Sequence, residues 1–143
     1  MNASNIHLRA MGAIHRQTGE RDWDGVEAVG YDDPAVAGVE KRELIGPADG
    51  AAHYRLRHFH VPAGGRTARE SHPHDHGVVI VSGRARVTLG DAEHDVGAGD
   101  VVYVGGDELH CFEALGDEPL EFLCVSPPKP ADAGTGRLRR EQR

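Results

Sequence analysis

The sequence has few cysteines, few aromatic residues, little positive charge and no long apolar run. Its two cysteines, Cys111 and Cys124, are too few for a disulfide framework, and both are expected to be small, reduced, buried side chains. The net charge of -7 argues against nucleic-acid binding, which needs a basic surface. No apolar run approaches the length of a membrane span. Residues 1–12 lack the apolar core of a secretory signal, so a cytoplasmic protein is expected.

Turn-forming residues, by contrast, are abundant, and they separate short apolar segments. The chain of 143 residues contains 19 glycines and eight prolines. Strands are predicted at 39–45, 53–61, 78–81, 85–89, 93–96, 101–104, 109–114 and 120–125. Such regularly spaced short strands with glycine turns are typical of a β-sandwich or barrel, and the length suits one domain. We therefore expect an all-β barrel over residues 39–126.

The two ends of the chain differ from this central part. Residues 1–38 are polar and weakly periodic, and Trp23, Val26 and Val29 are expected to dock as a short arm or strand. Residues 127–143 are rich in proline, glycine and alanine and then become basic, which predicts a disordered tail.

The most informative stretch runs from Glu70 to His76, where three of the ten histidines fall within five residues. Residues i and i+2 of a strand share a face, so Glu70 and His72 can point at one place. His76 follows a short turn, and His110 begins a later strand after a glycine-rich turn. Imidazoles with a carboxylate suit Fe, Mn, Co, Ni or Zn, and barrel mouths commonly hold small ligands. We therefore predict one divalent transition metal ion held by these four residues.

An alternative ligand set remains open. In it, His74 replaces Glu70 beside His72, His76 and His110. In the favoured set His74 lies at the rim, where it can contact a substrate.

Other residues are expected to line the cavity around the metal. Along 53–61, Phe59 and Val61 mark the inward face, which turns Arg57 inward and, by the same alternation, Arg55. Arg57 is then either a clamp for an anionic substrate or one half of a salt bridge at the rim. His58 and His60 fall on the opposite face, which is expected to pack or to form a dimer contact. Three aromatic residues are expected as pocket walls: Tyr103, Phe112 and Phe122. Cys111 is expected to point away from His110.

This pattern resembles the cupin superfamily over residues 54–125. The first cupin motif is G-x5-H-x-H-x(3,4)-E-x6-G. Counting back from Gly83 places its glutamate slot at His76 and its two histidine slots at Glu70 and His72. The residue types of the motif are kept, but glutamate and histidine have exchanged places.

The second cupin motif, G-x5-P-x-G-x2-H-x3-N, is also matched in part. Gly99 and His110 occupy their slots, whereas Gly105 stands in the proline slot, Asp107 in the glycine slot and Ala114 in the asparagine slot.

The resemblance implies a jelly-roll barrel, a double-stranded β-helix, and a metal-dependent enzyme acting on a small molecule. Dioxygenase-like oxidation of a small anionic or dicarbonyl substrate is the activity expected first, with Glu70 as fourth ligand or general base. A redox-neutral lyase, isomerase or decarboxylase is an alternative, as is a non-catalytic binding or sensor protein with a structural metal. The resemblance also implies a homodimer in which N-terminal strands are exchanged. The net charge and the lack of a long apolar run predict no nucleic-acid or membrane partner.

Overall fold

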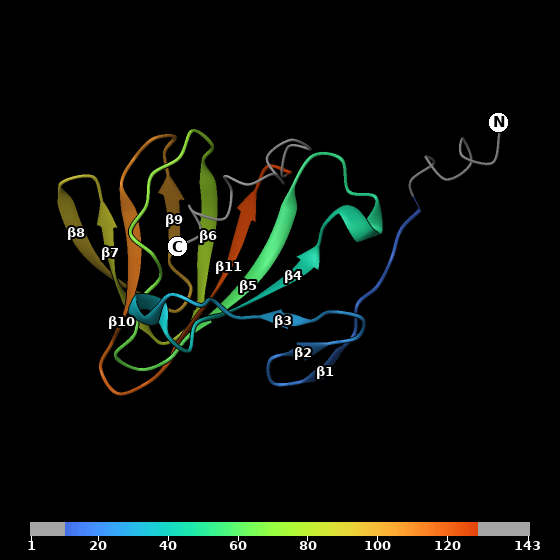
Figure 1. Ribbon diagram of the computed structural model, residues 1–143, viewed down its shortest axis with the longest axis horizontal. Coiled ribbons are helices and arrows are strands. Elements are labelled where there is room, and N and C mark those ends of the chain that lie inside the picture. The colour runs from blue at the N-terminus through green and yellow to red at the C-terminus, as the bar shows by residue number, and fades with distance from the viewer. Residues whose placement is uncertain (1–10, 129–143) are drawn as a thin grey trace.

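The computed structural model describes residues 11–128, which form two β-sheets and a small N-terminal hairpin. Figure 1 shows the smaller sheet at the left, the larger sheet across the centre and the hairpin at the lower right. The strands are β1 (Gln17–Gly19), β2 (Asp22–Trp23), β3 (Ala28–Val29), β4 (Glu40–Ile45), β5 (Arg55–Val61), β6 (His76–Ser82), β7 (Arg84–Leu89), β8 (Ala92–Gly97), β9 (Val101–Val104), β10 (His110–Leu115) and β11 (Leu120–Ser126). Two short 3-10 helices, η1 (Pro34–Val36) and η2 (Pro47–Asp49), flank β4.

The strand order confirms the predicted all-β jelly roll. The larger sheet has the order β3-β4-β5-β11-β6-β9 and the smaller sheet the order β10-β7-β8, and neighbouring strands are antiparallel. The eight predicted strands correspond to β4 to β11, with ends that shift by two residues at most.

The core lies between the two sheets because alternate residues of each strand point inward. Phe59 of β5 stacks on Phe122 of β11 at 5.0 Å between ring centroids. Phe122 in turn stacks on Phe112 of β10 at 4.8 Å, which joins the larger sheet to the smaller one. Burying each ring stabilises the fold by roughly 1.5–3 kcal/mol.

Gly83, the residue that sets the register of the first motif, occupies the tight link between β6 and β7. Its φ of 81° is in the left-handed region, and a Cβ there would overlap the carbonyl oxygen of Pro119. Only glycine fits this position without strain.

The N-terminal arm covers part of the outer face of the larger sheet. Trp23 packs on His58 of β5 with ring centroids 5.1 Å apart, and β3 pairs with β4. Further along, Val36 is buried in the core between the sheets. The arm is therefore part of the folded domain, and the strand-exchanged homodimer stays a prediction.

None of the helices in residues 11–128 has the length and apolar character needed to cross a membrane. The predicted disordered tail lies outside the described residues from position 129 onward.

Candidate metal centre

A cavity of about 140 Å³ opens between the sheets. Histidines, cationic side chains, aromatic rings and small apolar side chains share its wall. The lining residues are Tyr31, Val36, Val39, Lys41, Arg55, Arg57, Phe59, Thr67, Ala68, Glu70, His72, His74, His76, Val78, His110, Phe112, Phe122 and Cys124. A cavity of this size holds a compact ligand, since an engineered one of about 150 Å³ binds benzene.

Three of the predicted ligands come together from three places in the chain. His76 opens β6, His110 opens β10, and His72 lies in the loop before β6. The His72 loop is fixed from the opposite side, because the backbone N–H of Asp107 donates to the carbonyl of His72 at 2.7 Å. Gly106 allows this approach, since a Cβ there would crowd the carbonyl oxygen of Pro73 at 2.5 Å.

The ring nitrogens of these histidines face one point. One nitrogen of each of His72, His76 and His110 lies within 4.8 Å of the others. The Nε2 atoms of His72 and His76 are 3.0 Å apart. Two nitrogens bound at right angles to one metal, each at about 2.1 Å, stand roughly 3 Å apart, so the observed spacing suits a shared ion.

Hydrogen bonds orient two of the rings for this role. Nδ1 of His72 donates to the carbonyl of His74 at 3.0 Å, and Nδ1 of His110 donates to the carbonyl of Glu108 at 2.9 Å. A carbonyl only accepts, so Nδ1 carries the proton and the Nε2 lone pair is left for a metal. Nδ1 of His76 faces the Sγ of Cys124 at 3.5 Å.

Burial favours the neutral form of three imidazoles in the cavity, those of His74, His76 and His110. Burial, followed by the charges of Arg57 and neighbouring histidines, lowers the pKa of His76 to about 2. Burial is also the main cause that lowers the pKa of His110, and it lowers the pKa of His74 to about 4. Metal ligation requires neutral imidazole, so the donor set fits a divalent transition metal ion.

Neither Glu70 nor His74 joins this three-histidine group within residues 11–128. Glu70 exchanges backbone hydrogen bonds with His110, which puts both side chains on the cavity face. His74 stacks on His72 with centroids 3.9 Å apart and planes 3° from parallel. Both residues line the cavity beside the group, so both alternatives for a fourth ligand stay predictions.

The face of β5 that was predicted to point inward, the one with Phe59, faces the cavity in the structure. Arg55, Arg57 and Phe59 line the cavity, whereas His58 and His60 lie on the other face. Phe112 and Phe122 also line the cavity, as expected.

The placement of Tyr103 as a pocket wall is wrong. Its side chain is 65% exposed, lies outside the cavity lining, and donates a hydrogen bond from its hydroxyl to Asp75 at 2.7 Å. The reason is the alternation of β9, in which the buried Val102 and Val104 face inward and Tyr103 faces outward.

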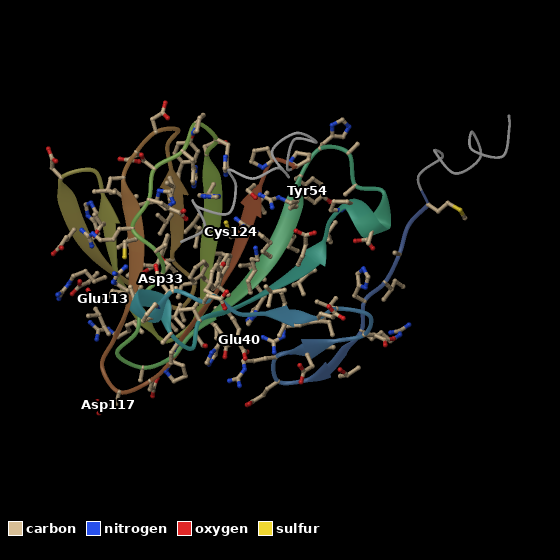
Figure 2. The ribbon with its side chains drawn as sticks, viewed as in Figure 1. Asp33, Glu40, Tyr54, Glu113, Asp117 and Cys124 are labelled. Atoms are coloured by element: carbon tan, nitrogen blue, oxygen red, sulfur yellow. The ribbon has the colours of Figure 1, made fainter. Side chains whose placement is uncertain are left out.

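Several lining residues were not predicted. Lys41 lies on β4 opposite Phe59 of β5. The alternation of inward and outward residues along the predicted 39–45 strand could therefore have placed Lys41 on the cavity face. Tyr31 and Val36 come from the arm, where no periodicity marks them. Cys124 lies on β11 within the body of the molecule, while Asp117 is at its lower edge (Figure 2). Cys111 is buried but lies outside the lining, as expected.

Two sheets around a cavity with three converging histidines define a small barrel protein with a transition-metal donor set. The chain belongs to the cupin family, and the family model for the cupin domain matches residues 57–126. It is 34% identical over 125 residues to the 1-methylthio-D-xylulose 5-phosphate methylsulfurylase of Rhodospirillum rubrum, covering 82% of this chain and 80% of that protein.

Solved structures agree with this assignment. A cupin 2 conserved barrel domain protein from Rhodopseudomonas palustris superposes with a TM-score of 0.70 at 31% identity, covering 84% of this chain and 88% of that one. A polyketide cyclase from Streptomyces resistomycificus superposes with a TM-score of 0.68 at 27% identity, covering 82% of this chain and 79% of that one.

Proposed function

We propose that this protein is a metal-dependent enzyme that carries out redox-neutral chemistry on a small hydroxy-carbonyl compound. The observation that carries the proposal is the convergence of three imidazole nitrogens in a cavity that also holds Glu70 and Tyr31. An ion-binding donor set and groups able to move a proton therefore face the same small space.

His72, His76 and His110 would hold the ion. A divalent metal supplies Lewis-acid polarisation of a substrate oxygen, which makes the neighbouring C–H bond more acidic. The carboxylate of Glu70 accepts that proton and returns it to the adjacent carbon, so the reaction needs no oxidant.

Tyr31 is suited to donate a hydrogen bond to the developing oxyanion. Burial is the main cause that raises its pKa to about 12, with the charge of Arg57 opposing and that of Glu70 adding to the rise. Its hydroxyl therefore stays protonated at neutral pH. The rings of Phe59, Phe112 and Phe122 exclude water from this side of the cavity.

The comparisons support carbonyl chemistry of this type. The R. rubrum relative is a methylsulfurylase of a pentulose phosphate, and the S. resistomycificus protein is a polyketide cyclase. Neither name is that of an oxygenase, which favours the redox-neutral alternative over the dioxygenase-like oxidation expected first. The dioxygenase-like oxidation stays a prediction, and consumption of O2 during turnover would identify it.

The test combines metal analysis with proton exchange. Purified protein is analysed for bound metals, reloaded separately with Mn, Fe, Co, Ni or Zn, and incubated in D2O with pentulose phosphates, including the methylthio compound named for the relative. We expect metal-dependent deuterium incorporation next to the carbonyl, or turnover, without O2 uptake.

Matched variants make this test specific. His110→Ala should abolish the exchange, whereas His94→Ala, on the exposed strand β8, should retain it. Oxygen uptake in step with substrate loss would favour the dioxygenase, and binding without exchange or turnover would favour a sensor protein.

A further inference from the structure

The two inward arginines of β5 differ in their partners. Arg55 donates from Nε to the carbonyl of Pro127 at 3.0 Å and from Nη2 to the hydroxyl of Ser126 at 3.1 Å. Its Nη1 lies 3.9 Å from a carboxylate oxygen of Glu43. The guanidinium of Arg55 is therefore used to fasten β5 to its surroundings.

Arg57 has fewer hydrogen-bond partners within residues 11–128, and its guanidinium lies over the Phe59 ring at 5.1 Å from the centroid. Its Nη2 donates only to the thiol sulfur of Cys124 at 3.4 Å, a weak acceptor. Its Nε is buried without a hydrogen-bond partner, and no ion pair joins Arg57 to a carboxylate in this part of the chain. Arg57 as a whole is half-buried, so the cost of its unpaired charge falls mainly on the buried Nε side of the guanidinium. A partly buried guanidinium that lacks an anion is suited to bind one from a ligand.

The surroundings of Arg57 add to the positive potential. Burial and then the charge of Arg57 lower the pKa of Arg55, so the two guanidinium groups repel each other. Lys41 lines the same cavity and lies 5.9 Å from the centroid of the Tyr31 ring. An anion in this region would relieve the repulsion.

We propose that Arg57 binds an oxyanion group of the substrate, a phosphate or a carboxylate, with Arg55 as a structural residue. The planar guanidinium matches the geometry of either group and places it in the cavity shared with the histidines. This inference rests on the proposed function in one respect only, namely that the ligand is a substrate.

Binding of three matched hydroxyketones tests the proposal. Dihydroxyacetone is neutral, dihydroxyacetone phosphate carries a phosphate, and hydroxypyruvate carries a carboxylate. Isothermal titration of metal-loaded protein should show at least one charged ligand binding roughly 30-fold more tightly than dihydroxyacetone, as charge-assisted hydrogen bonds allow. The charged ligand that is preferred identifies the group as phosphate or carboxylate.

Arg57→Met should abolish this preference while metal content and dihydroxyacetone affinity stay unchanged, and Arg55→Met should retain the preference. The melting temperatures of the ligand-free variants give a second distinction between the roles of Arg57 and Arg55. Arg57→Met should melt at the same temperature or higher, because it removes a half-buried charge that has no anionic partner, and Arg55→Met should melt lower.

An absent preference, its persistence in Arg57→Met, or a melting loss in Arg57→Met as large as in Arg55→Met would overturn the proposal. Failure of the proposed function looks different. Inorganic phosphate or acetate would then still bind in an Arg57-dependent manner, to a protein that holds no metal or turns over no hydroxyketone.

Discussion

Two sets of histidines lie on opposite sides of the larger sheet, and they differ in what occupies their ring nitrogens. On the outer face, Nε2 of His58 meets a carboxylate oxygen of Glu121 at 3.1 Å, and Nε2 of His60 meets a guanidinium nitrogen of Arg21 at 3.1 Å. In the cavity, the Nε2 atoms of His72 and His76 meet each other at 3.0 Å.

Histidine therefore has two different roles in this barrel, packing on the outer face of the sheet and presenting ring nitrogens in the cavity. The outer histidines complete a packed polar layer under the arm, where each ring has a partner from the protein. The cavity histidines use Nδ1 to fix their rings and present the second nitrogen to a shared point. What the Nε2 atom faces, rather than burial, distinguishes the two sets: a protein side chain on the outer face, and a point shared with other imidazoles in the cavity. Nδ1 of His58 is buried without a hydrogen-bond partner, so an unpartnered ring nitrogen alone does not mark a metal ligand.

The largest expected effect is on metal binding. His110→Ala removes one of the three proposed ligands and should weaken metal affinity by more than roughly 10–100-fold, the loss typical of removing a group that only supports a ligand. His58→Ala should keep the metal, as should His94→Ala. Elemental analysis after dialysis measures all three, and equal retention of metal by these variants would contradict the assignment of the centre.

Acid should destabilise the metal-free protein. The unfolded chain protonates its histidines near pH 6.5, whereas His76 stays neutral in the fold because its pKa is about 2. The unfolded state therefore binds more protons, and stability falls as the pH drops below 6.5, by about 1.4 kcal/mol per pH unit for each such histidine. Urea unfolding between pH 7 and 5 measures this slope, which His76→Ala should reduce by one histidine's share; an unchanged slope would count against the buried neutral ring.

Loss of an outer histidine should cost stability instead of metal. His58 is 3% exposed, packs on Trp23 and pairs with Glu121, so His58→Ala should lower the free energy of unfolding by about 2 kcal/mol. His60→Ala, at a half-buried position, is the matched control with a smaller loss. Chemical denaturation of both variants, with metal present, gives the comparison, and a larger loss for His60→Ala would reverse it.

The thiol beside His76 should have a moderate effect. Cys124→Ala removes the group that faces Nδ1 of His76 and should weaken metal affinity about 10-fold. Cys111→Ala, a buried thiol outside the cavity lining, should leave the affinity unchanged. Competition with a chelator measures both, and equal affinities would show that this contact does not support the ligand.

The smallest effect is expected in the turn that fixes the His72 loop. Asp107 adopts a left-handed φ of 63°, the conformation for which the family motif supplies glycine. Asp107→Gly should therefore change the free energy of unfolding by less than about 1 kcal/mol and keep the metal, since aspartate tolerates this region and glycine favours it. Asp107→Val should lose more, and thermal melting of both variants would detect a reversed order.

Much of the barrel was predictable because alternation and glycine turns are local signals. The same holds for Arg57, whose inward orientation followed from Phe59 and Val61 on one strand. Tyr103 was placed on the wrong face because every residue of its strand is apolar or aromatic. The strand contains no polar residue that would mark which alternate positions face solvent.

The role of the arm could not be predicted, because Tyr31 and Val36 reach the cavity through contacts distant in sequence. Glu70 shows a second limit. Its face could be predicted from the spacing, but its position beside His110 could not, because paired backbone hydrogen bonds between residues far apart in the chain hold it there.

Because the arm docks on the barrel, the residues that line the cavity come from two different parts of the chain. Barrel strands and the loops between them supply the histidines, while the segment before β4 supplies Tyr31 and Val36. Sequence changes before β4 can therefore reshape the space offered to a ligand without moving the nitrogens. In evolutionary terms, one part of the cavity wall lies on a segment of the chain separate from the histidines, so the shape of that wall can change while the donor set is kept.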